Sequence, residues 1–503
     1  MTAKDAYDKL RTHMKEYWLL ASTAELLEWD QETYMPKGGA DNRADQMGLL
    51  ARLTHEMFTD PNVGEWIATC EASDLVKDPE SKEAANIREL RRMYDRRTRL
   101  PKEFVEESAK LTSKAQHIWA DARKASDFKL FEPWLVKILD MNRKKADYYG
   151  YETEVYDALM DDYEPGAKAA EVEKVFSGLR KELVELNKRI ANAPRRPDIS
   201  ILKRPYDVKK QRIFAELVVN AIGFDFRDGR LDETVHPFCT SIGPGDTRIL
   251  TRYYPEDLGE GLTGAMHEAG HGLYELGADP KELGMPCGFA DSLGMHESQS
   301  RMWENQVGRS RATWVYFFPQ AQRIFRESLE GVSLEQFYHA MNYSAPSYIR
   351  VEADEATYNL HIMLRFELER AMLRGDVQVA DVPGEWNKRF KDYLGIEVDK
   401  DSNGCLQDIH WSMGAMGYFP TYTLGNLYAA QFYAKVREEI SDLDKHFEKG
   451  DFTPLLKWLR ENIHIHGARW RAADLCKRVT GKPLSHRPLI DYMNNKYAEI
   501  YGI

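Results

Sequence analysis

Cysteine is scarce in this sequence of 503 residues, and the few thiols show no paired pattern. The five cysteines are odd in number, widely scattered and free of any CxxC spacing. This usage excludes a scaffold held together by disulfides and indicates a reducing compartment, with the cytoplasm as the default. The thiols are expected to be free and mostly buried: Cys70, Cys239, Cys287, Cys405 and Cys476.

Long hydrophobic runs are also missing. No segment approaches the roughly 18 uninterrupted apolar residues that a membrane-spanning helix needs. The opening stretch MTAKDAYDKLRTHMKEYW is charged throughout and lacks the apolar core of a signal peptide. The sequence therefore predicts neither a membrane span nor a secretory leader.

Positive charge is in the minority, with 69 Lys and Arg against 81 Asp and Glu, a net charge of −12. This balance argues against a general nucleic-acid binder and against a protein that binds anionic membranes. Two common catalytic motifs, the P-loop and G-x-S-x-G, are absent. GEGLTG (259–264) matches G-x-G-x-x-G, but no βαβ unit follows it, so its glycines are interpreted as places of close backbone packing.

Most of the sequence shows helical periodicity, and segments with the pattern of a β-strand are rare. The best strand candidates are 234–242 and 247–254, joined by the turn-forming Gly-Pro-Gly-Asp at 243–246, which predicts a hairpin. We expect a mainly α protein with a small sheet, and 43% hydrophobic residues suffice for a large core. Apolar residues recur at three- and four-residue spacing in 5–28, 40–58, 102–122, 128–148, 170–193, 345–373, 424–440 and 485–502.

The segment GLTGAMHEAGHGLYE (261–275) carries the clearest chemical signal. In a helix, positions four apart lie about 40° apart, so His267 and His271 project from one face and can bind one zinc ion. Glu268 points to the side of that pair, where it can reach a metal-bound water without binding the metal, as a general base does. The alternative is an ordinary helix whose two histidines are structural.

A catalytic zinc needs a third protein ligand and an open position for water. The next helical segment, 290–308, offers Glu297, which two antiparallel helices could bring beside the histidine pair. Glu275 is an alternative one turn beyond His271, although three ligands on consecutive turns of one helix diverge. Glu304 is a second alternative, for which a salt-bridged surface residue is the simpler interpretation.

Two further stretches hold groups that could bind substrate. IRVEADE (349–355) places Arg350 and Asp354 four apart, which predicts either a helical ion pair or an arginine that grips a carboxylate. GCLQDIHW (404–411) and GYFPTY (417–422) supply His410, Tyr418 and Tyr422, which could donate hydrogen bonds to an oxyanion. Taken alone, these aromatic residues would more often belong to a core.

The combination of motifs resembles the M32 family of metallocarboxypeptidases, the thermostable carboxypeptidase type. The similarity runs nearly end to end, from LLEWDQETYMPKGGADNRADQ (26–46) to LIDYMNNKY near the C-terminus. We see no departure at any motif position. The motifs that carry the resemblance, in matching spacing, are HPF, DTRILT, HEAGH, HESQ, IRVEAD and GCLQDIHW.

The resemblance implies a zinc- or cobalt-dependent enzyme that removes single residues from the C-terminus of peptides. It implies a single peptidase domain over 1–503, a helical fold of two lobes around a deep groove, a lid region over 1–95, a metal and catalytic core over 230–430, and a homodimer. It also implies roles for individual residues. These are metal ligands His267, His271 and Glu297, base Glu268, oxyanion donors His410 and Tyr422 (favoured over Tyr418), and substrate contacts Arg350, Gln407 and Asp408.

Two other functions stay open at this point. An endo-acting zinc oligopeptidase would share the metal site but would also cut peptides whose C-terminus is blocked. A helical binding protein with a purely structural metal would normally surround the ion with four protein ligands.

Overall fold

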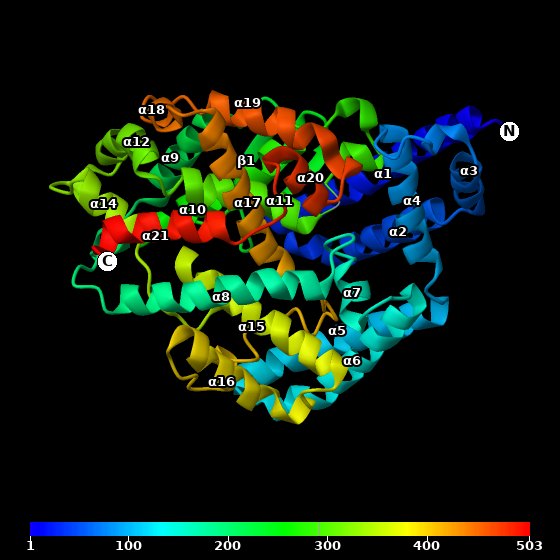
Figure 1. Cartoon of the computed structure of the whole chain (residues 1–503), viewed down its shortest axis with the longest axis horizontal. Coiled ribbons are helices and arrows are strands. Elements are labelled where there is room, and N and C mark those ends of the chain that lie inside the picture. The colour runs from blue at the N-terminus through cyan, green and yellow to red at the C-terminus, as the bar shows by residue number, and fades with distance from the viewer. Residues whose placement is uncertain (291) are drawn as a thin grey trace.

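Helices carry most of the chain in the computed structural model, which describes residues 1–290 and 292–503 (Figure 1). Every segment predicted to be helical contains a helix, and most ends agree within a few residues. These helices are α1 (Ala3–Thr33), α2 (Ala40–Phe58), α5 (Lys102–Ala125), α6 (Phe128–Tyr149), α8 (Ala169–Ala191), α15 (Glu355–Arg374), α17 (Pro420–Glu439) and α21 (Arg487–Tyr501).

The start of α15 corrects one prediction. The helix begins at Glu355 and not at 345, because the Asp354 side chain caps it by accepting hydrogen bonds from the amides of Ala356 and Thr357. Arg350 lies before the helix, in a short 3₁₀ turn (Arg350–Glu352). A helical ion pair between Arg350 and Asp354 is therefore wrong, and Asp354 acts as a helix cap.

The remaining helices were not individually predicted from periodicity, although those at 258–275 and 293–301 fall in the histidine segment and the segment after it, both of which were expected to be helical. Many are short, and short amphipathic segments give a weak periodic signal. They are α3 (Pro61–Glu71), α4 (Lys82–Thr98), α7 (Val155–Met160), α9 (Val208–Ala221), α10 (Leu258–Glu275), α11 (Leu293–Arg301), α12 (Arg311–Ile324), α13 (Arg326–Leu329), α14 (Leu334–Met341), α16 (Val382–Leu394), α18 (Leu443–Phe447), α19 (Thr453–Asn462) and α20 (Ala472–Thr480).

The predicted hairpin is present as β2 (Phe238–Gly243) and β3 (Asp246–Thr251), which pair antiparallel around a turn with Gly245 at φ +79°. A third strand, β1 (Gly229–Glu233), pairs parallel with β3, so the order is β1-β3-β2. The β1 strand is not predictable from its sequence because three of its five residues, Arg, Asp and Glu, carry charges. The β2 strand consequently lies at one edge of the sheet.

Two groups of helices surround the centre of the molecule (Figure 1). Helices α5, α6, α15 and α16 lie below α8 in the view of Figure 1, whereas α9, α10, α12 and α19 lie above it. The N-terminal helices α1, α3 and α4 share a small core of their own, with Leu10, Ile67 and Leu90 among its residues. Helix α1 also packs against β2. Within the described residues, no helix combines the length and apolar character needed to cross a membrane.

Candidate active site

The two histidines of α10 meet a carboxylate from α11. The Nε2 atoms of His267 and His271 lie 3.5 and 3.4 Å from Oε2 of Glu297. One ligand atom from each of these residues lies within 4.8 Å of the others, and no other such cluster is found in the described chain. Two imidazole nitrogens and one carboxylate oxygen are a donor set that zinc binds, with one position left for water. The residues present therefore fit a divalent metal.

Two glycines allow Glu297 to approach the histidines so closely. A Cβ atom at Gly270 of α10 would lie 2.6 Å from the carbonyl oxygen of Gln299 in α11. A Cβ atom at Gly425 of α17 would lie 2.6 Å from Cγ of Glu297 itself. Helix α11 is thus held between α10 and α17 at a spacing that only glycine permits.

The other ring nitrogen of His267 is held by Glu304. Its Nδ1 lies 2.9 Å from Oε2 of Glu304, which sits in a π-helical turn (Met302–Val307). Burial would raise the pKa of Glu304, but the Arg301 guanidinium and His267 outweigh it and lower the pKa to about 2. Glu304 is salt-bridged to Arg301 and its side chain is only 12% exposed, so its interpretation as a surface residue is wrong. A carboxylate on Nδ1 fixes the proton there and leaves Nε2 free for a metal.

His271 is held in the same way by a chain of two residues. Its Nδ1 lies 2.5 Å from Nδ1 of His296, whose Nε2 lies 2.7 Å from Oε1 of Glu275. Protons on Nδ1 of His271 and on Nε2 of His296 satisfy both contacts and again leave Nε2 of His271 with a free lone pair. Glu275 and Glu304, the alternative ligands, thus both lie behind a histidine ring. His296 was not among the residues predicted from the sequence, although it opens the HESQ motif.

Glu297 carries a full negative charge in this setting. Its Oε1 accepts a hydrogen bond from Nε of Arg301 (2.7 Å), and its Oε2 accepts one from Ser300 (3.0 Å). Burial opposes the charge, but Arg301 and His267 hold the pKa of Glu297 well below its usual range. The carboxylate is therefore ionised and fixed in orientation before any metal binds.

Glu268 differs from the other carboxylates around it. The side chain is only 5% exposed, and its Oε2 has no hydrogen-bond partner among the described residues. Burial raises the pKa of Glu268 to about 7, despite the opposing effect of His267. A carboxylate with a pKa near neutrality and a free oxygen is suited to accept and return a proton.

Arg350 lies in a cluster of charged and aromatic groups. Its Nη2 and Nε donate to Oδ1 of Asp408 at 2.8 and 3.0 Å, and its Nη1 donates to the hydroxyl of Tyr358 at 3.1 Å. The other oxygen of Asp408 accepts from Nε of Arg365 at 2.7 Å. Two guanidinium groups share one carboxylate, so the cluster keeps a net charge of about +1. Arg365 is fully buried and was missed from the sequence.

The loop between α16 and α17 brings the remaining predicted residues together. The amide of Gln407 accepts from the backbone N–H of Arg350 (2.8 Å) and donates to the carbonyl of Tyr348 (3.0 Å). The Tyr422 hydroxyl lies 3.5 Å from Nε2 of His410, and the ring of Tyr418 lies 5.3 Å from that of His410. Contacts with substrate stay a prediction for Gln407 and Asp408, whose polar atoms are occupied within the protein.

A buried acid of α15, missed from the sequence, anchors this loop. Glu369 is 0% exposed and accepts hydrogen bonds from Trp411 Nε1 (2.9 Å), the Gly417 amide (3.1 Å) and the Tyr156 hydroxyl (2.7 Å). Burial raises the pKa of Glu369 to about 7, although these donors oppose the rise. Glu369 and Arg365 lie one turn apart on α15, and together they tie down the segment that carries Asp408 and His410.

Known proteins match this chain along its whole length. The family model described as Carboxypeptidase Taq (M32) metallopeptidase matches residues 9–497. The chain belongs to the M32 family. It is 47% identical to thermostable carboxypeptidase 1 of Thermus thermophilus, with both chains fully covered, and 37% identical to carboxypeptidase 1 of Bacillus subtilis over 98% of this chain and 99% of that protein.

Solved M32 structures share the fold. The crystal structure of the M32 carboxypeptidase from Deinococcus radiodurans R1 superposes with a TM-score of 0.96 at 40% identity, covering 99% of this chain and 100% of that one. The predicted family and the mainly α fold with a small sheet are confirmed. Membership of M32 makes the protein a metallocarboxypeptidase that depends on a divalent metal and acts on peptides.

Proposed function

We propose that this M32 enzyme releases single residues from peptides with a free C-terminal carboxylate, using a zinc ion held by His267, His271 and Glu297. The convergence of these three side chains beside Glu268, whose buried Oε2 has no hydrogen-bond partner among the described residues, is the observation that carries the proposal. Two imidazoles and a carboxylate suit zinc, and imidazole ligands also suit cobalt, which is the second candidate.

Glu268 is the proposed general base. When bound, the metal supplies a water of lowered pKa and a Lewis acid for the peptide carbonyl. Glu268 takes the proton of the attacking water and passes it to the departing amine nitrogen. Its own pKa near neutrality suits both transfers, because the carboxylate must accept a proton and then give it up within one turnover.

His410 and Tyr422 are the proposed donors to the oxyanion. Burial lowers the pKa of His410 to about 4, so the ring is neutral and has one N–H to donate. Burial also raises the pKa of Tyr422 well above its usual value, so its hydroxyl keeps its proton. One such donor is typically worth about 3 kcal/mol of transition-state stabilisation. Tyr418, whose ring lies 5.4 Å from that of Tyr422, is the alternative.

Arg350 is the proposed clamp for the terminal carboxylate. A guanidinium binds a carboxylate through two parallel hydrogen bonds, so a fixed Arg350 sets the scissile bond at one residue from the chain end. Asp408 and Gln407 support this role by holding the side chain and the backbone of Arg350, and they contribute to the substrate site in this way.

Paired peptides test the proposed function. A pentapeptide with a free C-terminus and its amidated counterpart are incubated with the zinc enzyme, with and without a chelator, and the products are weighed by mass spectrometry. We expect loss of one terminal residue from the free peptide only, and no products with the chelator. Cleavage of the amidated peptide at an internal bond would favour the oligopeptidase. Arg350→Ala should lower kcat/KM for the free peptide by at least about a hundredfold.

We also propose a cytoplasmic homodimer. The family resemblance supports the dimer, and the scattered free cysteines support a reducing compartment. Nucleic acid is not an expected partner, given the net charge of −12. Sedimentation of the purified enzyme over a range of concentrations checks the dimer.

A further inference from the structure

A cavity of about 600 Å³ lies between α1, the β2–β3 hairpin and the C-terminal end of α10. Trp18 of α1 closes one side of it, where a Cβ atom on Gly243 would lie 3.1 Å from the indole. Cys239, Thr240 and Ser241 of β2 form another wall. The mechanism proposed above assigns no role to this space.

The inner end of the cavity adjoins the reaction centre. His296 lines the cavity and contacts the ring of His271. Cys239 also lines it, close enough to Glu268 for that charge to add to burial in raising the pKa of the thiol. The cavity is therefore separated from His271 by one residue, His296, and its wall residue Cys239 feels the charge of Glu268.

Arg350 lies beyond a different ligand. Nε of Arg301 donates to Glu297, and the guanidinium groups of Arg301 and Arg350 lie 4.5 and 6.0 Å from the ring centre of Tyr358. Starting from the proposed metal site, Arg350 therefore lies on the side of Glu297. The cavity lies on the side of His271 and Glu268. A peptide whose terminus lies at Arg350 and whose last peptide bond lies at the proposed metal ligands can extend its upstream residues toward the cavity, on the side away from Arg350.

The wall formed by β2 suits an extended peptide. Within the described chain, β2 pairs only with β3 and occupies the edge of the sheet. An edge strand presents backbone N–H and C=O groups to which an extended chain can add. Residues upstream of the scissile bond can therefore lie along β2 with their side chains directed toward the cavity walls.

The charge of the cavity is strongly one-sided. Five carboxylates line it against one guanidinium, that of Arg460. Glu25 is held only by a hydrogen bond from Thr240 (2.9 Å), and Asp228 forms no ion pair with any described residue. The other three acids have basic partners, which are Arg227 for Asp225, His296 for Glu275 and Lys82 for Asp279.

We propose that this acidic cavity binds the peptide upstream of the scissile bond and makes the enzyme prefer substrates with Lys or Arg at the third to fifth positions from the C-terminus. The inference rests on the proposed function, because it places the terminal residue at Arg350. Glu25 and Asp228 are the specificity-determining residues, since neither carboxylate forms a salt bridge with a described residue.

Matched peptides test the preference. Two heptapeptides share their last two residues and differ only at positions three to five from the C-terminus, with two Lys in one and two Glu in the other. We expect kcat/KM to be about three- to tenfold higher for the lysine peptide at low salt, because each partly exposed ion pair is worth up to about fivefold. The ratio should shrink toward one in 0.5 M NaCl, where the Debye length is about half its value in physiological salt.

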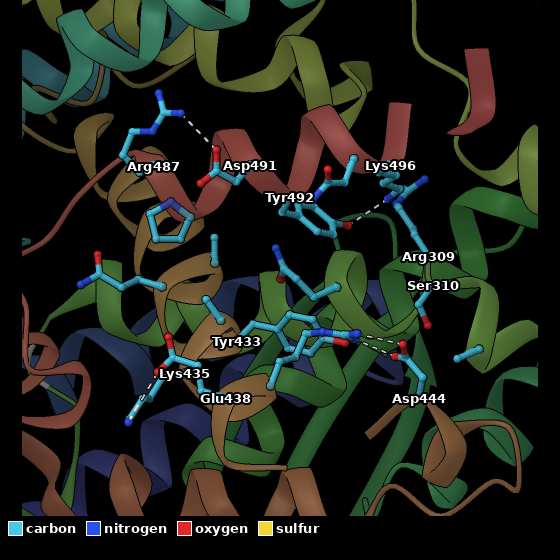
Figure 2. Close-up of a pocket in the computed structure, with 18 of the residues that line it drawn as sticks. Arg309, Ser310, Tyr433, Lys435, Glu438, Asp444, Arg487, Asp491, Tyr492 and Lys496 are labelled. Atoms are coloured by element: carbon cyan, nitrogen blue, oxygen red, sulfur yellow. Dashed lines mark hydrogen bonds and ion pairs between the residues drawn. The ribbon is translucent and has the colours of Figure 1, made fainter. Parts of the chain in front are cut away.

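Charge-neutralising variants locate the effect. Glu25→Gln and Asp228→Asn should each reduce the lysine preference about twofold or more, and two independent variants guard against one that misfolds. Glu438→Gln is the matched control. It removes one acidic charge from a separate cavity of about 740 Å³ between α17 and α21, where Glu438 lies near Lys435 (Figure 2). This control should keep the wild-type ratio.

The outcomes separate the inference from the proposed function. Equal kcat/KM for the two peptides, or faster trimming of the glutamate peptide, would overturn the acidic-cavity preference while single-residue release still stood. A preference that Glu438→Gln reduces as much as Asp228→Asn does would also overturn it, because whole-protein charge would then explain the effect. Release of no terminal residue from either peptide would overturn the proposed function itself.

Discussion

At the scale of single residues, four neighbouring carboxylates differ in charge state and in pKa because they contact different groups. Glu297 and Glu304 contact Arg301 and stay ionised, with the pKa of each lowered. Glu275 faces His296. Of these four, only Glu268 has a fully buried oxygen without a hydrogen-bond partner in the described chain, and burial raises its pKa. The environment, and not the residue type, thus separates the proposed ligand and its supports from the proposed base.

Replacing the base should separate metal binding from catalysis. Glu268→Gln keeps the shape of the side chain but cannot accept a proton, so we expect kcat to fall by about a hundred- to ten-thousandfold. Zinc content should stay at the wild-type value, because Glu268 is not a proposed ligand. Elemental analysis and a peptide-release assay measure both quantities. Activity near that of the wild type would remove Glu268 from its role.

Glu304 should affect the zinc affinity of the site without contacting the ion itself. Glu304→Gln weakens the hydrogen bond that orients His267, and supports of this kind change metal affinity by about ten- to a hundredfold. Titration of the apoprotein against a competing zinc chelator measures the dissociation constant. Glu335→Gln, which breaks an exposed ion pair with Arg311, is the control. An unchanged zinc affinity in Glu304→Gln would show that His267 is positioned by other contacts.

At the scale of elements, the site depends on how closely three helices approach one another. Helical spacing predicted His267 and His271 as neighbours. Glu297 was one of three candidates for the third ligand on the residues alone, and the M32 resemblance favoured it. The sequence did not reveal Arg365, Glu369 or the His296 contact, since these depend on tertiary packing of residues far apart in the chain. Strand β1 was not predicted for the same reason, because its pairing with β3 stabilises a strand whose charged composition disfavours one.

A methyl group at the crossing of α11 and α17 should disturb the metal ligand. In Gly425→Ala the new Cβ would lie 2.6 and 2.7 Å from Cγ and Cβ of Glu297, so the side chain must move. We expect a cost of about 1–3 kcal/mol in stability and weaker zinc binding. Gly384→Ala on α16 is the matched control, since nothing lies within 4 Å of its Cβ. Equal zinc affinity in the two variants would contradict the packing argument.

Glu369, which anchors the loop between α16 and α17, should make the free energy of unfolding depend on pH. The pKa of Glu369 rises from an ordinary value of 4.5 to about 7 on folding, so the folded state binds more protons between these values. The stabilisation that Glu369 adds to the free energy of unfolding is therefore complete below pH 4.5. It is lost as pH rises toward 7, by up to about 3 kcal/mol. Glu369→Gln should remove this slope from the melting temperature. Parallel curves for the two proteins would show that Glu369 does not titrate in this range.

At the scale of the whole molecule, the metal is expected to add stability without being needed for the fold. Most of the core lies away from the site, and the ligands are already fixed by Arg301, Glu304 and His296. The helices of the enzyme should therefore persist when the metal is removed, in contrast to small domains that fold only around zinc.

Chelation tests this expectation. Complete removal of zinc should leave the far-ultraviolet circular dichroism unchanged and lower the melting temperature, because a ligand at about a thousand times its Kd stabilises by about 4 kcal/mol. Elemental analysis confirms removal, and added zinc should restore the melting temperature. Loss of helical signal on chelation would show that the metal holds the fold together.

The position of α11 between two glycine-lined helices has a consequence for how the enzyme acquires its ion. Because the ligand atoms of the three proposed donor side chains already lie within 4.8 Å of one another, we expect metal loading to require no rearrangement of the helices. Which divalent ion occupies the site should then depend on the ions that the cell supplies and on the spacing of these three side chains. The metal should be removable and replaceable without unfolding the protein.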